Sequence, residues 1–206
     1  MPAPIALDDT TSLRLIARED GPSLASAYRR NRRHLAPWEP VRSVRFFESG
    51  GQTDAIADVL FAHRAGSVLP MVLERGDDIV GRLTLSNVVH GAFDSADLGY
   101  WLDASLQGRG LMTRAVGEML RLARTELGLH RVQAGTLLHN RGSQAVLEHN
   151  GFERIGIARR YLRIAGEWQD HVLFQVLLEG EGGGRLEPPD PADPGPGSRP
   201  VRGRLV

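Results

Sequence analysis

The residues with the clearest chemical potential form a glycine-containing turn at 107–110, with the sequence Gln-Gly-Arg-Gly. The turn follows an apolar segment at 98–102 that is typical of a strand. It precedes a periodic segment, starting at 111, that is typical of an amphipathic helix. A helix N-terminus carries unpaired backbone N–H groups and a partial positive charge, and glycines before it let a ligand approach the backbone closely. The sequence therefore predicts that this strand, turn and helix hold a phosphate group.

Two amino acids are absent from the 206 residues, cysteine and lysine. The lack of cysteine excludes disulfides, a thiolate nucleophile and cysteine-bound metal. The lack of lysine excludes a Schiff-base lysine and the lysine of the phosphate loop in nucleotide hydrolases. Basic and acidic residues number 25 each, so no global field favours nucleic acid or an anionic membrane. The phosphate therefore belongs to a ligand of another class.

Alternating apolar and polar residues predict strands, and apolar residues with a helical period predict helices, interspersed along the chain. Strands are expected at 11–17, 68–74, 79–85, 98–102, 129–138, 152–160 and 168–178. Helices are expected at 21–34, with Asp20 as its cap, and at 53–65, 111–127 and 141–149, and a loop is expected at 86–95. This order predicts an α/β fold with a mixed sheet of about seven strands and four helices in one domain.

The two ends of the chain differ from this central domain. Residues 1–10 form an expected N-terminal extension, without the basic segment and apolar run of a signal peptide. Residues 180–206 are rich in Gly and Pro and poor in large apolar side chains, so a disordered tail is expected. The domain itself is expected at 11–179. No window approaches 18 apolar residues, so we expect no membrane span and a cytoplasmic protein.

The turn at 107–110 resembles the acetyl-CoA motif of the GNAT family of N-acetyltransferases, although Met112 stands where that motif has a small residue. Other segments resemble its RimJ branch, the ribosomal-protein-alanine N-acetyltransferases, in which Met112 is normal. These segments are 34–42, 86–89, 98–100, 107–112, 139–143, 150–153 and 166–171. The resemblance covers about 13–178 in collinear order and identifies 11–179 as a GNAT domain.

The resemblance implies the GNAT acyl-CoA N-acyltransferase fold, with mostly antiparallel strands, acetyl-CoA as donor and no metal. It also implies that the strand at 98–102 splays from its neighbour and exposes its backbone to the pantetheine arm. The residues implied in binding acetyl-CoA are Tyr100, Trp101, Leu102, Gln107, Gly108, Arg109, Gly110, Leu111, Met112, Thr113, Asn140 and Ser143. At least one of Tyr100 and Trp101 is expected in the core, because neighbouring strand side chains point to opposite faces. Arg114 is expected either beside the phosphates or on a solvated helix face.

Ser143 matches the serine that the RimJ and RimL branches carry where many relatives have a tyrosine that protonates the departing thiolate. A serine hydroxyl is a poor acid, so the implied role is a hydrogen bond to the thiolate or a water relay. The alternative is a helix-start serine that satisfies local backbone, next to Asn140 as a helix cap.

The general base is expected to be a carboxylate that acts through water, because an N-terminal α-amine has a pKa of about 7.7–8.0. Glu39 is the first candidate, since it lies in the branch signature and on a loop. Glu74, Asp97 and His171 are the alternatives.

The implied reaction moves acetyl from acetyl-CoA to a protein N-terminus by direct attack in a ternary complex, and the implied acceptor is an alanine of a small-subunit ribosomal protein. A small amine such as an antibiotic or polyamine is an alternative acceptor, and a non-catalytic acetyl-CoA sensor or ribosome-assembly factor is a second alternative. A basic cluster is expected either to contact the ribosome or to be a solvated helix face; its core is Arg29, Arg30, Arg32 and Arg33, with Arg42 and Arg45 nearby. Monomer and homodimer both remain open.

Overall fold

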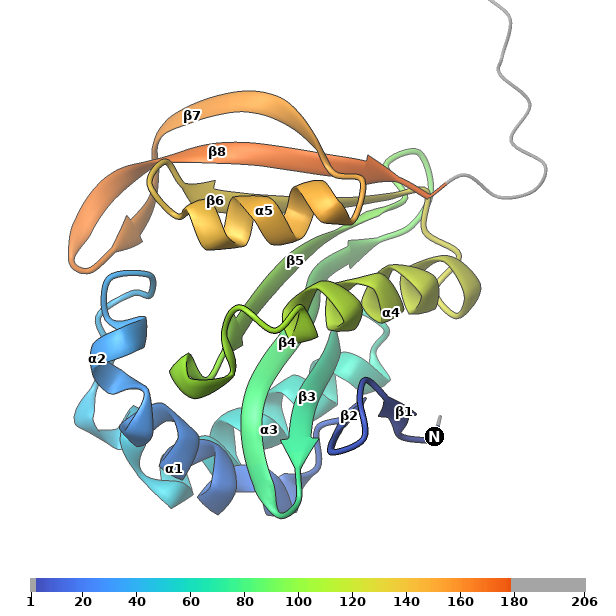
Figure 1. Ribbon diagram of the computed structural model, residues 1–206. Helices are drawn as coiled ribbons and strands as arrows, with labels where there is room; N and C mark the ends of the chain where they lie inside the picture. The colour runs from blue at the N-terminus through green and yellow to red at the C-terminus, as the bar shows by residue number, and fades with distance from the viewer. Residues whose placement is uncertain (1–2, 179–206) are drawn as a thin grey trace, which may run out of the picture.

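An eight-stranded mixed sheet forms the centre of residues 3–178, which a computed structural model of the chain describes (Figure 1). The strands are β1 (Ile5–Ala6), β2 (Thr11–Leu15), β3 (Leu69–Arg75), β4 (Asp78–Val89), β5 (Ser95–Leu102), β6 (Arg131–Leu137), β7 (Glu153–Ile164) and β8 (Glu167–Leu177). Their order across the sheet is β1-β2-β3-β4-β5-β6-β8-β7, and only β5 and β6 pair in parallel. The predicted tail at 180–206 lies outside the described residues.

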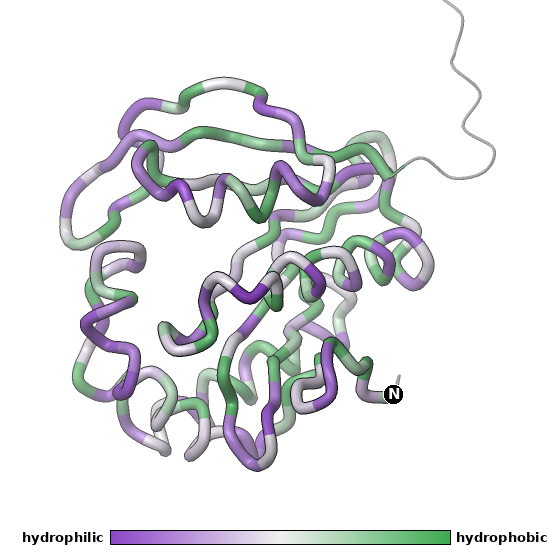
Figure 2. The backbone as a smooth tube through the Cα atoms, in the orientation of Figure 1, coloured by the Kyte–Doolittle hydropathy of each residue, from purple (hydrophilic) through white to green (hydrophobic). Residues whose placement is uncertain are grey.

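Helices cover both faces of this sheet. The α-helices are α1 (Gly21–Arg30), α2 (Arg32–Leu35), α3 (Ser49–Arg64), α4 (Leu111–Thr125) and α5 (Arg141–His149). Short 3₁₀ turns occur at η1 (Arg18–Asp20), η2 (Val44–Phe47) and η3 (Ala104–Leu106). The helices α1, α2 and α3 share one apolar core, and α4 and α5 share the other. In Figure 2 hydrophobic and hydrophilic residues alternate along α4 and α5, as expected of helices with one buried face.

Strand β3 lies between the two cores and contributes to both. Met71 and Leu73 belong to the core under α4, whereas Val72 belongs to the core under α1 and α3. This alternation follows from the pleat, which points successive side chains to opposite faces. It explains why β3 is a continuous apolar run in the sequence, because a strand covered on both faces has no polar side.

The mixed α/β fold and the strand predictions are confirmed, with one strand more than expected. The additional strand, β1, falls inside the predicted N-terminal extension and pairs antiparallel with β2. Two residues are too few to show a period, so no sequence pattern indicated it. The predicted loop at 86–95 was also wrong in part, because β4 continues to Val89 through a bulge at which Asn87 has a φ of 51°.

The predicted helix at 21–34 is divided into α1 and α2 at Asn31. The Asn31 side-chain amide donates to the Ala27 carbonyl (3.0 Å) and to Asp103 Oδ2 (2.8 Å), which holds this residue at the end of β5. Asp20 occupies the predicted N-cap position of α1, but its side chain makes no capping hydrogen bond to that helix. Its carboxylate accepts from the backbone N–H of Ala17 (2.7 Å) and from both terminal nitrogens of Arg14 instead.

Helix α3 begins at Ser49, four residues before the predicted start. The segment at 49–52 contains two glycines, which favour a turn when only the neighbouring residues are considered. Tertiary packing explains Gly51, since a Cβ atom there would lie 1.9 Å from the Arg45 carbonyl oxygen. The close approach of η2 therefore requires glycine inside the first turn of α3.

The feature of the fold that matters most for function is the divergence of β5 and β6. The two strands pair only between 95–97 and 131–133, although β5 continues to Leu102 and β6 to Leu137. Beyond Asp97 the backbone of β5 has no strand beside it on that side. The splayed strand implied by the resemblance is therefore present, and α4 and α5 begin on either side of the opening (Figure 1).

Candidate active site

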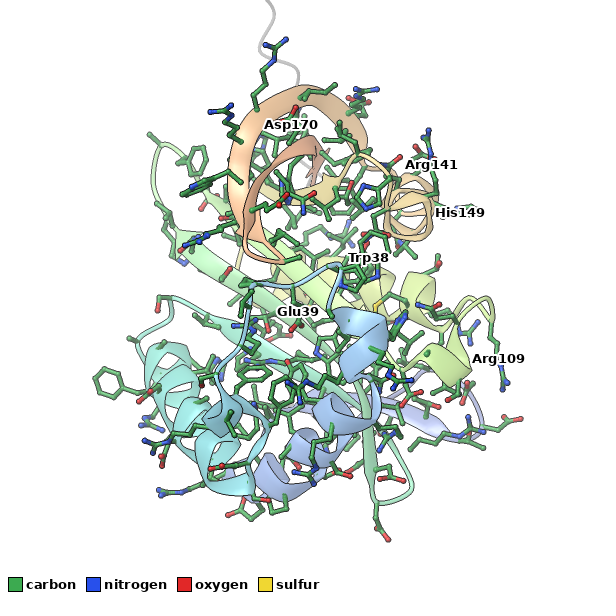
Figure 3. The ribbon with its side chains drawn as sticks, turned by 90° about the vertical axis from the view of Figure 1, so that its left-hand side faces the viewer. Trp38, Glu39, Arg109, Arg141, His149 and Asp170 are labelled. Atoms are coloured by element: carbon green, nitrogen blue, oxygen red, sulfur yellow. The ribbon has the colours of Figure 1, made fainter. Side chains whose placement is uncertain are left out.

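A cavity of about 730 Å³ lies in the opening between the diverging strands. Its lining includes every residue implied in acetyl-CoA binding except Arg109, together with Glu39. Arg109 is exposed, and Figure 3 shows its side chain pointing away from the body of the protein. The volume falls in the usual range for small-molecule sites. The structure thus brings together side chains from α2, β5, α4 and α5.

One end of the cavity is formed by the turn before α4. Gly108 and Gly110 have φ values of 72° and 68°, in the left-handed region that favours glycine. This conformation leaves the first backbone N–H groups of α4, at 111–113, without intrahelical partners beside the cavity. Arg114 lines the cavity, but its Nε donates to the carbonyl of Leu7 (2.9 Å) and so attaches the N-terminal segment to α4.

The middle of the cavity is lined by Tyr100 and Trp101, whose side chains leave β5 on opposite faces. The indole of Trp101 packs against the core of α1 and α3 and donates to the hydroxyl of Tyr28 (3.0 Å). This confirms that one of the two aromatic residues has a packing role. The ring of Tyr100 extends toward α5, where its hydroxyl lies 2.8 Å from Ser143 Oγ and 3.1 Å from the Ser143 carbonyl oxygen.

Asn140 and Ser143 organise the N-terminus of α5. The Asn140 side-chain oxygen accepts from the backbone N–H of Ser143 (3.2 Å), so the predicted helix cap is confirmed. Burial raises the pKa of Tyr100 to about 12, and its hydrogen bond with Ser143 offsets only part of this effect. The phenol is therefore protonated, and able to donate, at every pH at which an amine is acetylated.

Glu39 lies on the loop after α2, and only 19% of its side chain is exposed. Its backbone carbonyl accepts from the N–H of Ala165 at the tip of the β7–β8 hairpin (2.9 Å), and its Oε2 lies 3.5 Å from Arg42 Nε. Burial raises the pKa of Glu39, while the positive charges of Arg42 and Arg82 oppose the rise. A carboxylate with a raised pKa is better suited to accept a proton near neutral pH than an exposed one.

A second cavity, of about 290 Å³, lies on the other side of Glu39. It is lined by α1, α2, the loop at 36–42, Phe47 and Ala165. Leu35 and Glu39 line both cavities, so Glu39 lies where the two cavities meet. Figure 3 shows Trp38 and Glu39 between the half of the molecule that carries α1–α3 and the half that carries the β7–β8 hairpin.

The alternative bases do not line either cavity. Glu74 accepts from Arg14 (2.6 Å), and Asp97 accepts from the Asn87 amide (2.8 Å). His171 is 3% exposed, and its Nδ1 lies 3.0 Å from the carbonyl oxygen of Gln169. Glu39 is the member of the four that the fold brings to the cavity.

The basic cluster on α1 and α2 is largely engaged with the protein itself. Arg29 donates to the Phe47 carbonyl (2.7 Å), and the Arg32 guanidinium lies 4.6 Å from the centre of the Phe47 ring. Arg30 forms an ion pair with Asp103 (2.8 Å). Three of the four exposed arginines in this cluster therefore also contact η2 or the residue after β5, which the charge pattern alone did not indicate.

Two contacts across the cavity were not expected from the sequence. His34 Nε2 lies 2.9 Å from Gln107 Nε2, and the Trp38 ring lies 5.2 Å from the ring of His139. Each pair joins the segment at 34–42 to the donor side of the cavity. All four residues lie in segments that resemble the family, which marked them as candidates. Which residue contacts which could not be predicted, because the two members of each pair are distant along the chain.

Comparison with known proteins agrees with this fold and site, which are those of an acetyltransferase. The family model described as acetyltransferase (GNAT) domain matches residues 11–153. The chain belongs to the GNAT acetyltransferase family. Among the described residues no group of three or more His, Asp or Glu side chains is arranged to hold a metal ion. No helix within 3–178 is long and apolar enough to cross a membrane.

Three relatives that are more than 30% identical to the chain show its similarity within this family. The chain is 36% identical over 167 residues to the ribosomal protein uS5-alanine N-acetyltransferase of Escherichia coli, a match that covers 80% of this chain and 86% of that protein. The ribosomal-protein-S5-alanine acetyltransferase of Vibrio fischeri has a similar structure, with a TM-score of 0.83 and 32% identity over 86% of this chain and 98% of that one. Mycobacterium smegmatis RimJ, solved with a CoA disulfide, has a TM-score of 0.78 and 34% identity over 81% of each chain.

Proposed function

We propose that this acetyltransferase moves acetyl from acetyl-CoA to the α-amino group at the N-terminus of a protein, by direct attack in a ternary complex. The observation that carries the proposal is the position of Glu39, which lines both the large cavity and the smaller one beyond it. A donor in the first cavity and an acceptor in the second would meet at a carboxyl group with a raised pKa. Such a meeting point is what a ternary-complex mechanism requires.

The donor would occupy the large cavity. Its pyrophosphate would be held by the backbone N–H groups of the turn and of the first residues of α4, between Gln107 and Thr113. The pantetheine arm would pair with the backbone of β5 that is left without a neighbouring strand, beside Tyr100, Trp101 and Leu102. A backbone N–H of this strand would polarise the acetyl carbonyl, and Asn140 and Ser143 would lie beside the end of the arm.

The acceptor amine would enter from the smaller cavity. Since an α-amine has a pKa of about 7.7–8.0, a large fraction is neutral near pH 8, and its attack on the carbonyl then releases one proton from the nitrogen. Glu39, directly or through water, would accept that proton as the amine attacks the carbonyl carbon. Ser143 would donate a hydrogen bond to the thiolate that departs.

The relatives support the choice of acceptor. Two relatives that match at least 80% of this chain act, by their names, on an alanine of ribosomal protein S5, a small-subunit protein. We therefore propose an alanine of a small-subunit ribosomal protein as the acceptor, which would place the reaction in the cytoplasm. Contact with the ribosome through the exposed arginines of α1 and α2 stays a prediction.

The test is an acceptor assay that follows CoA release. The purified chain is incubated with acetyl-CoA and either a peptide that begins with alanine, taken from a small-subunit ribosomal protein, or a panel of polyamines and aminoglycosides. We expect release of CoA with the peptide at a kcat/KM at least about tenfold above that with any small amine. The matched control is the same peptide with its N-terminus blocked, which should release no CoA above background.

Two results would overturn the proposal. Acetylation confined to the small amines would assign the enzyme to another acceptor class. Binding of acetyl-CoA without transfer to any amine would favour a sensor or assembly factor.

A further inference from the structure

The hydroxyl groups of Tyr100 and Ser143 form a pair at the wall of the main cavity. Tyr100 belongs to β5 and Ser143 to α5. The two residues are 43 positions apart in the chain, and their hydroxyl oxygens lie 2.8 Å apart. Both residues line the cavity at the point where β5 and β6 diverge. Packing of the Tyr100 ring alone does not require this hydrogen bond between its hydroxyl and Ser143 inside the cavity.

Two arrangements of the hydrogens keep a hydrogen bond between the two hydroxyls, because each hydroxyl carries a single hydrogen. In the first, the phenol donates to the Ser143 carbonyl oxygen, 3.1 Å away, and the serine hydroxyl donates to the phenol oxygen. In the second, the phenol donates to Ser143 Oγ. Only the second leaves the serine hydrogen available to a third group in the cavity.

We propose that Tyr100 is a positioning residue that directs the Ser143 hydroxyl hydrogen toward the sulfur of coenzyme A as the thioester breaks. This inference rests on the proposed function, because it assigns a role in the release of coenzyme A. Negative charge that develops on sulfur favours the second arrangement, since only then does the serine donate to it. The raised pKa of Tyr100 keeps the phenol a donor throughout.

The step balances without ionisation of either hydroxyl. The acceptor nitrogen forms a bond to the acetyl carbon, the carbon–sulfur bond breaks, and the sulfur keeps the electron pair. Ser143 donates a hydrogen bond to the thiolate, and Tyr100 donates one to Ser143 Oγ. The proton of the attacking amine leaves through Glu39 and water, and solvent protonates the thiolate, for which a cysteine-like pKa of about 8.5 is the reference.

The test is a double-mutant cycle with Tyr100→Phe and Ser143→Ala, measured with whichever amine the wild-type chain acetylates. Phenylalanine keeps the ring and removes only the hydroxyl. We expect Tyr100→Phe to lower kcat by about threefold to tenfold, the range of one neutral hydrogen bond, and to leave the KM for acetyl-CoA within about twofold. In the Ser143→Ala background the same change should have no further effect on kcat. The matched control is Tyr161→Phe, on β7 outside the cavity, which should keep wild-type kinetics.

The melting midpoint of each variant shows whether a lower kcat comes from unfolding or from the loss of the positioning role of Tyr100. The cycle is run at a temperature at which every variant is folded. A wild-type kcat for Tyr100→Phe, or effects of the two changes that multiply, would overturn the inference and leave the proposed function standing. A parallel change in KM would also overturn it, because it would indicate a binding role. A wild-type chain that acetylates no amine would overturn the proposed function and this inference with it.

Discussion

At the scale of single residues, Glu39 combines burial with a position beside both cavities. Its carboxyl group is largely buried, which raises its pKa, and it lies between two cavities, where a proton acceptor is useful. The positive charges of Arg42 and Arg82 oppose this rise, because they favour the ionised carboxylate. The loop that carries Glu39 is fixed by the hydrogen bond from Ala165, which keeps Glu39 where the two cavities meet.

Replacement of Glu39 by glutamine should lower kcat by about 10²-fold, because general base catalysis contributes about 10²–10⁴-fold and water replaces part of it. The acid limb of the pH profile of kcat should also lose the contribution of the carboxyl group, whose pKa burial raises from its ordinary value in the wild type. The measurement is kcat between pH 5 and 9 at saturating substrates, with Glu48→Gln as the exposed control outside both cavities. An unchanged kcat at pH 7 would remove Glu39 from the mechanism.

The same substitution should not destabilise the fold at neutral pH. Because the folded pKa of Glu39 is raised, the folded state binds the proton more tightly than the unfolded state does. The free energy of unfolding therefore falls as pH rises from the unfolded value, near 4.5, through the folded value, and the penalty is complete above it. Denaturant titration at pH 8 should give Glu39→Gln a stability equal to or above that of the wild type, and a clear loss would contradict this reading.

Single residues were predictable where their role is local. The glycines at 108 and 110 and the cap at Asn140 depend on neighbours within a few positions, and the sequence pattern indicated them. The Tyr100–Ser143 pair and the docking of Glu39 on Ala165 depend on contacts between distant segments. No period or motif carries such information, so only the folded arrangement reveals it.

At the scale of elements, Asp103 connects the two sides of the site. It directly follows β5 and accepts from Arg30 (2.8 Å) and Asn31 (2.8 Å) at the α1–α2 junction, and from the N–H of Ser105 (3.0 Å) at η3. Burial alone would raise the pKa of Asp103, but these hydrogen bonds together hold it well below the ordinary value. The carboxylate thereby fixes the helices of the acceptor side relative to the turn of the donor side.

Asp103→Ala should lower the free energy of unfolding by about 3 kcal/mol, because it leaves Asn31 and part of Arg30 without partners in a buried setting. Thermal or urea unfolding measures the loss, and the matched control is Asp54→Ala, which removes an exposed ion pair with Arg45 and should change stability little. Since the pKa of Asp103 is lowered, its contribution is present at neutral pH and is lost as pH falls through the acidic range. Equal stability of the two variants would contradict this account.

The turn before α4 makes a second element-scale prediction. Gly110→Val places a β-branched residue at a φ of 68° and brings its Cβ to 3.3 Å from Arg114 Nη1, so the turn must change shape. We expect the dissociation constant for acetyl-CoA to rise at least about tenfold, the equivalent of one strong phosphate contact. Calorimetry measures it, with Gly91→Val as the control, because Gly91 has a φ of 90° in a loop remote from the cavity. Similar affinities of both variants would remove the turn from the binding site.

Helices and strands with one buried face were predicted well. They were predicted poorly where the local residue preference favours one structure and tertiary packing requires another. Helix α4 shows the first case, since its periodic residues between Leu111 and Ala123 are all buried. The start of α3 shows the second, because glycines that favour a turn locally are required there by the approach of η2. The break at Asn31 belongs to the same class, as its cause is a carboxylate 72 positions away.

At the scale of the whole described molecule, strands β1–β5 and strands β6–β8 form two halves of the sheet, which are joined by one short parallel pairing and by the shared core under α4 and α5. The sheet is continuous through the pairing of 95–97 with 131–133, and beyond that contact the halves are held together by pairs such as His34 with Gln107 and Trp38 with His139. A ligand in the opening would contact both halves at once. Binding should therefore stabilise the molecule as a unit.

Acetyl-CoA at about 100 times its dissociation constant should add about 2.7 kcal/mol of stability, which corresponds to a rise in melting midpoint of about 5–10 °C for a chain of this size. Differential scanning fluorimetry measures the shift, and ATP at the same concentration is the control for phosphate binding alone. No shift at millimolar acetyl-CoA would contradict both the enzyme and the sensor readings.

The central claim is that a donor and a protein N-terminus meet at Glu39, and the most direct test is the position of the acetyl group on one product. The substrate is a peptide that begins with alanine and contains one lysine, whose ε-amine has a pKa of about 10.4 and is mostly charged at pH 8. After incubation with the chain and acetyl-CoA, fragmentation mass spectrometry locates the modification. Acetyl on the α-amine alone is the predicted result, and acetyl on the lysine, or on neither amine, would contradict the account.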